Sequence, residues 1–117
     1  VTIVAPKVGG ATLSDGKKMP ANGQLAGTPS VFFDAVAIVL TEAAAKQLAR
    51  ESAARDFVSD AFVHLKAIAA DAGAQTLLKA GGVKKGAGIV EAADPKAFIA
   101  AARTRQWARE PMVRMLP

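Results

Sequence analysis

The sequence predicts an α/β domain whose sheet is mostly parallel, and two stretches carry that prediction. In residues 56–71, Phe57, Ala61 and Leu65 recur at helical spacing, and a short apolar run at 67–70 follows. A helix that leads into a short buried strand is typical of α/β folds. The second stretch, 31–40, is the strongest strand signal in the chain. Its continuously apolar second half favours a strand buried on both faces of a parallel sheet.

The N-terminal quarter of the chain is predicted to form a strand and then an irregular arm. Residues 1–4 are apolar and β-branched, which favours a strand that ends before Pro6. Residues 9–27 are polar and rich in glycine, and they contain the turn dipeptides Asp15-Gly16 and Asn22-Gly23. We therefore expect a short hairpin or an extended arm here.

Capping signals place the helices that follow. Thr41 is positioned to cap one helix, and Asp94 followed by Pro95 is the expected start of the last one. The last helix would present Phe98, Ile99 and Ala102 as its apolar face. The predicted helices are 42–49, 53–65, 75–80 and 95–103, and one further strand is predicted at 89–90. The tail, 106–117, mixes apolar residues with arginines and is expected to pack on a neighbouring surface.

Composition limits the classes of function. The length of 117 residues suits one domain, and a hydrophobic fraction of 51% is enough for a core. The absence of cysteine removes disulfides and thiolate chemistry, and it agrees with a cytoplasmic location. No apolar run is long enough to cross a membrane. The net charge of +5 invites a nucleic-acid partner, but Trp107 is the only tryptophan available for stacking, so a solvated basic face or a protein contact is favoured.

The predicted fold and the residue types together indicate where a functional site could lie. In α/β folds a site is expected at the carboxyl end of a strand, which here means Asp71, Ala72 and Gly73, and these residues offer no evident catalytic chemistry. His64 is the only histidine and could pair with Asp60, but a metal site needs more ligands, so no metal is predicted. No serine lies in a G-x-S-x-G motif, and the glycine-rich residues 81–88 lack a phosphate-loop pattern and favour a turn.

An ordered set of segments resembles the C-terminal domain of the large-subunit haem catalases. The segments are G-T-P-S at 27–30, F-D-A-V at 33–36, D-F-V-S-D-A-F-V-H-L-K-A-I-A at 56–69, G-I-V-E-A at 88–92 and R-Q-W-A-R-E-P at 105–111. No single motif is specific, but the order covers essentially the whole chain. The resemblance implies a flavodoxin-like three-layer fold related to the class I glutamine amidotransferase and DJ-1/PfpI superfamily.

The resemblance also implies a function. The parent enzyme decomposes hydrogen peroxide to water and oxygen in the oxidative stress response, at a haem in a separate core, and it is a homotetramer. The C-terminal domain has no catalytic site or cofactor of its own, and it supports stability, assembly and chaperone-like protection of unfolded proteins. Its partners would be the catalase core of the same polypeptide and unfolded clients, with no nucleic acid and no membrane. The surface for such partners is expected at Phe32, Phe33, Trp107, Met112 and Leu116.

Two alternatives stay open at this point. The first is a DJ-1/PfpI-like hydrolase or deglycase relic, whose nucleophilic cysteine would fall at 71–73, where no residue can replace a thiolate. The second is a small-ligand site in the crevice near Thr41 and Asp71. Its only support is that proteins of this fold class often bind ligands at that place.

One departure from the family concerns the start of the domain. The family has a strand and a helix before the segment that resembles residues 1–5, and this sequence lacks both. In a flavodoxin-like sheet that strand lies between the second and the third. We therefore expect residues 1–117 to be a single C-terminal catalase domain that is incomplete at its N-terminus. A complete five-stranded sheet built by these residues alone would contradict this expectation.

Overall fold

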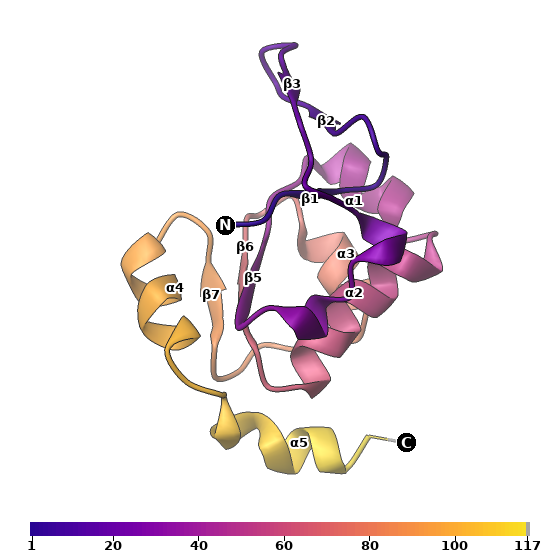
Figure 1. Ribbon diagram of the computed structural model, residues 1–117. Helices are drawn as coiled ribbons and strands as arrows, with labels where there is room; N and C mark the ends of the chain where they lie inside the picture. The colour runs from indigo at the N-terminus through magenta and orange to yellow at the C-terminus, as the bar shows by residue number, and fades with distance from the viewer. Residues whose placement is uncertain (117) are drawn as a thin grey trace.

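The centre of the fold is a parallel sheet of three strands, seen in the computed structural model, which describes residues 1–116 (Figure 1). The strands are β5 (Ala35–Ile38), β6 (Ala67–Ala70) and β7 (Ile89–Glu91), in the order β5-β6-β7. Val36 pairs with Ile68, and Ile68 pairs with Ile89, so these side chains share one face of the sheet. The prediction of an α/β fold with a mostly parallel sheet is confirmed.

Helices cover the two faces of this sheet unequally. The core lies on one face, where α1 (Glu42–Leu48), α2 (Ser52–Val63) and α3 (Gln75–Ala80) pack on the sheet. It contains the following buried residues: Val36, Ile38, Ala45, Leu48, Val58, Phe62, Ile68, Leu77 and Leu78. A single helix, α4 (Pro95–Ala102), lies on the other side of the sheet against β6 and β7 (Figure 1). The domain therefore has three layers, and the layer on the α4 side consists of a single helix.

The predicted caps are confirmed by their hydrogen bonds. The Thr41 side chain accepts from the Ala44 N–H at 3.1 Å, and Asp94 accepts from the Ala97 N–H at 3.0 Å. The predicted apolar face of α4 is wrong in part, because no residue of α4 is buried and Ile99 is 57% exposed. The reason is that α4 packs only on the short strands β6 and β7, which leaves its outer side in solvent.

The N-terminal arm contains the predicted hairpin. β2 (Ala11–Thr12) and β3 (Lys18–Met19) pair antiparallel around Asp15-Gly16, and Gly16 has a φ of +82°. The predicted strand at 1–4 is wrong. The strand is β1 (Val4–Ala5), and it pairs in parallel with β4 (Gly23–Gln24), not with the central sheet. Ahead of it, the Ile3 N–H donates to the Asn22 side chain at 2.7 Å, which takes Ile3 out of a strand ladder.

The strand predicted at 31–40 is also shorter in the structure. Ser30–Phe32 is a 3₁₀ turn, in which the Phe33 N–H donates to the Ser30 carbonyl at 3.0 Å, and only Ala35–Ile38 forms β5. Burial on both faces is wrong as well, because Ala37 and Val39 are exposed, Val39 by 67%. α4 reaches β6 and β7, so the outer face of β5 stays uncovered.

The C-terminal tail forms a 3₁₀ turn, Trp107–Arg109, followed by α5 (Glu110–Arg114). The tail runs past the lower ends of the strands, on the amino side of the sheet (Figure 1). A third 3₁₀ turn, Leu25–Gly27, closes the N-terminal arm. Pro117, the last residue of the predicted tail, lies outside the described residues.

Candidate functional site

The carboxyl end of β6, where the fold would usually place a site, is held by backbone contacts. The Asp71 carboxylate accepts from the Leu40 N–H at 3.2 and 3.3 Å, and from the Ala74 N–H at 3.0 Å. Gly73 packs so closely on the Leu40 carbonyl that a side chain has no room there. Ala72 is exposed and has no reactive atom. Asp71 therefore joins the turns after β5 and β6, and its oxygens are occupied as acceptors.

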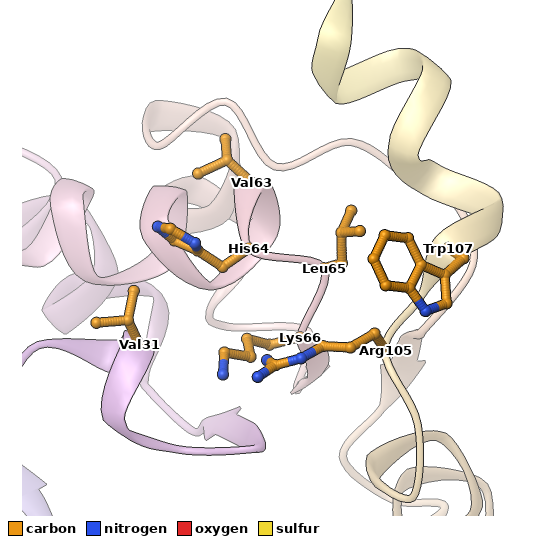
Figure 2. Close-up of a pocket in the computed structure, with 7 residues that line it drawn as sticks. All are labelled: Val31, Val63, His64, Leu65, Lys66, Arg105 and Trp107. Atoms are coloured by element: carbon orange, nitrogen blue, oxygen red, sulfur yellow. The ribbon is translucent and has the colours of Figure 1, made fainter.

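The opposite edge, at the amino ends of the strands, has an open hollow of about 400 Å³. We call it the basic hollow. It is lined by Val31, Val63, His64, Leu65, Lys66, Arg105 and Trp107 (Figure 2). These residues come from three separate segments, namely the turn before β5, the end of α2 and the tail.

The end of α2 brings four of these residues together, residues 63–66. The Lys66 N–H donates to the Ala61 carbonyl at 2.9 Å and the Leu65 N–H to the Phe62 carbonyl at 3.2 Å, which is the Schellman arrangement. Leu65 takes the left-handed position that glycine usually fills, with a φ of +62°. This turn ends the helix abruptly and sends the chain directly into β6.

The tail is attached at the same turn. The Gln106 N–H donates to the Leu65 carbonyl at 2.8 Å, and the Gln106 side chain donates to the carbonyls of Ala101 and Thr104. Gly88 gives the Gln106 side chain the space it needs. Because Gln106 is fixed in this way, its neighbours Arg105 and Trp107 are both held at the hollow.

The hollow gathers positive charge. Figure 2 shows the ends of Lys66 and Arg105 beside each other. Lys66 is 4% exposed as a whole residue, so its aliphatic stem is buried, while its ammonium group reaches the lining. Burial lowers the pKa of Lys66, the nearby Arg105 lowers it further, and Asp34 opposes both with a smaller effect. Among residues 1–116, neither Lys66 nor Arg105 forms a salt bridge.

Arg109 lies behind the hollow and fixes the tail to the domain. Its guanidinium donates to the carbonyls of Ala87, Phe62 and Lys66 at 2.7–2.9 Å, and to that of Ala61 at 3.4 Å. It also lies over the Phe62 ring, 4.7 Å from the centroid. Burial lowers its pKa. The net charge favoured a solvated basic face or a protein contact for the basic residues, and for Arg109, which is 2% exposed and bonded within the domain, that interpretation is wrong.

Comparison with known proteins identifies the family. A family model described as the C-terminal domain found in long catalases matches residues 1–105. This chain belongs to that family. Among curated relatives of this catalase domain, Catalase C of Rhizobium meliloti (strain 1021) is 41% identical over 97% of the chain. Catalase HPII of Pseudomonas putida is 29% identical over 98% of it. The chain spans 17% and 16% of the length of these two relatives.

The residues of this catalase domain do not fit a haem. The sequence has no tyrosine and no cysteine, and its one histidine, His64, lies exposed on the lining of an open hollow. The suggested Asp60–His64 pair is absent from the salt bridges of residues 1–116. The same residues contain no cluster of His, Cys, Asp or Glu able to hold a metal ion. Nor do they include a helix long and apolar enough to cross a bilayer.

The predicted partner-binding residues of the domain differ in exposure. Phe32 and Trp107 are 74% and 68% exposed, and Met112 and Leu116 are also on the surface. Phe33 is half-buried and packs on the core. Of the five, the structure places only Trp107 at the hollow, and Phe32 follows Val31, which lines it. Sequence reasoning missed Lys66 and Arg105, because tertiary hydrogen bonds, from the Gln106 N–H to Leu65 and from Arg109 to Lys66, bring these segments together.

Proposed function

We propose that this chain serves as the non-catalytic C-terminal domain of a long catalase, acting in stability and assembly. One observation carries the proposal: within residues 71–73, where the resemblance to DJ-1/PfpI enzymes would place a nucleophile, the Asp71 carboxylate bonds to the main chain of two turns. The curated relatives are catalases about six times as long as the matched region, which leaves room for a haem core elsewhere in the protein. The proposal includes a cytoplasmic, homotetrameric parent that decomposes hydrogen peroxide.

The coding sequence on the amino side of Val1 tests this directly. We expect a catalase core with its haem-ligating tyrosine, and a complete protein that shows haem absorbance and hydrogen-peroxide turnover. A complete protein with neither haem nor peroxide turnover would overturn the proposal. Turnover of a glyoxal or an amide by the chain itself would instead favour the DJ-1/PfpI-like alternative.

We further propose that the open edge of β5 pairs with a strand from a segment outside residues 1–117. Within the described residues, β5 pairs only with β6, whereas β6 is paired on both sides. β1 pairs with β4 and leaves the β5 edge free. The exposed Ala37 and Val39 would be covered by a helix that accompanies this strand. This arrangement corresponds to the strand and helix that the sequence analysis found missing.

A chaperone-like role is the finer part of the proposal, and it rests on exposed apolar side chains, chiefly Phe32 and Trp107. The test is light scattering from a heated client protein with the chain at an equimolar ratio. We expect suppression by the native chain and its loss in the Phe32→Ser, Trp107→Ser double variant. Ile99→Ser, which removes an exposed apolar residue from α4, is the control and should still suppress. If the native chain does not suppress scattering, the chaperone role is wrong.

A further inference from the structure

The basic hollow joins two cations that have no counter-charge bonded to them. Lys66 and Arg105 point to the same place in Figure 2 and form no salt bridge within residues 1–116. Two like charges held together repel each other, Lys66 is largely removed from water, and the nearby Asp34, which forms no salt bridge in that range either, offsets these effects only in part. An anion placed between them would gain from both, and His64 on the same lining could add a third donor.

The surroundings favour a protein partner over a small ion. The hollow is open, and its lining includes Trp107, which is 68% exposed, and the aliphatic side chains of Val31 and Leu65. Tryptophan and arginine are the residues most enriched at the centres of protein interfaces. A free ion would leave the indole in water, whereas a peptide could neutralise the cations and cover the ring together.

We propose that the basic hollow is a docking site for an acidic protein segment, with a carboxylate between Lys66 and Arg105 and an apolar side chain against Trp107. A second copy of this chain is the poorer occupant, because two molecules of net charge +5 repel each other. The proposal concerns recognition by this chain alone, so it stands or falls independently of the catalase role proposed above.

The chain carries its own reporter for a binding test. Trp107 is the only tryptophan and there is no tyrosine, so the fluorescence comes from the hollow. The probe is a short peptide with glutamates on both sides of one leucine. We expect saturable binding with a shift of Trp107 emission, weakened by added salt. We expect Arg105→Gln to weaken it at least about tenfold, as for a central interface arginine.

Matched variants and probes decide among the alternatives. Lys84→Gln removes one exposed positive charge outside the hollow and should leave the affinity within about twofold. Lys66→Met keeps the buried stem and removes only the charge, so it gives a second test if Arg105→Gln fails to fold. Supporting results are weakening by Arg105→Gln or Lys66→Met without weakening by Lys84→Gln.

Three results would overturn the proposal. The first is equal weakening by Lys84→Gln, which would show attraction by net charge alone. The second is binding of free glutamate or inorganic phosphate as tight as that of the peptide, which would make the hollow a small-anion site. The third is dimerisation of the chain without peptide, abolished by Arg105→Gln in sedimentation, which would make a second copy the occupant.

Discussion

Arg109 is one of several arginines in the last part of the sequence, and its neighbours give no sign that it differs from them. Arg103, Arg105 and Arg114 are exposed, whereas Arg109 is buried against main-chain carbonyls at the end of α2. These carbonyls have no partner within the helix, and a cation there also interacts favourably with the helix dipole. The two terminal nitrogens of the guanidinium therefore bond to the backbone without a carboxylate, while its Nε is buried without a hydrogen-bond partner among residues 1–116.

Replacement of Arg109 should be among the most damaging changes in the chain. Arg109→Ala removes the side-chain donor to the Ala87 and Lys66 carbonyls and the second donor to those of Ala61 and Phe62, and it should lower the free energy of unfolding by about 3 kcal/mol. Arg109→Lys should recover only part of this, because an ammonium cannot reproduce the planar fork. Urea unfolding measures both variants. Arg103→Ala, which alters an exposed arginine, should stay within about 0.5 kcal/mol of the native chain.

Lys66 predicts a rise of stability with pH. Because its pKa is lowered in the folded chain, the unfolded chain binds more protons between that pKa and the ordinary lysine value. Stability should therefore increase as pH rises through this alkaline window, and fall again as pH returns below the lowered pKa. Lys66→Met should remove this part of the pH dependence. The check is the urea midpoint across alkaline pH, with Lys84→Met as a variant that should retain the native dependence.

At the scale of the elements, helices were easier to predict than strands. Thr41, Asp94 and Pro95 mark helix starts by local chemistry, and the structure confirms those caps. The apolar run at 31–40 predicted a strand longer than the one observed. Hydrophobicity indicates that residues are buried, but it does not indicate that their backbone is extended. In this run, the 3₁₀ turn at Ser30–Phe32 leaves Phe33 half-buried against the core, although Phe33 is not part of a strand. The left-handed end of α2 at Leu65 was not predictable, since glycine is the usual residue.

The turn at Asp71 gives a prediction for the link between β5 and β6. Asp71→Ala leaves the main-chain N–H of Leu40 without its acceptor and leaves that of Ala74 with only its 3.3 Å bond to the Asp71 carbonyl, and it should cost about 1–3 kcal/mol. Asp71→Asn keeps one acceptor oxygen and should cost less. Thermal unfolding of both variants checks this order. If Asp71→Ala is neutral, the turn does not depend on the carboxylate, and its role here is wrong.

At the scale of the whole molecule, the family and fold class could be predicted from the order of segments, but the hollow could not. His64 and Lys66 lie at one end of α2 and Arg105 and Trp107 at one end of the tail, so no local pattern joins them. The prediction that the carboxyl edge lacks a nucleophile rests on residue types alone, so it needed no structure. The uneven cover of the sheet was missed, because it depends on which strands α4 reaches.

That uneven cover predicts a gradient of protection across the sheet. β6 is paired on both sides and fully buried, so its amides should exchange with solvent most slowly. β5 has a free edge, and its amides should exchange faster in this chain. Hydrogen exchange read by mass spectrometry or NMR measures the difference. In a complete protein that supplies the proposed strand, β5 should become as protected as β6; if it does not, the strand is not supplied.

The attachment of the tail by Arg109 also sets an order of events during synthesis. Lys66, whose carbonyl Arg109 holds, precedes it by 43 residues. At about 5–20 residues per second, a ribosome needs about 2–9 s to pass from one to the other. Throughout that interval the end of α2 and the start of β6 exist without the cation that joins them. The nascent domain is then open at the edge that later forms the basic hollow, until Arg109 is made and bonds to the Lys66 carbonyl.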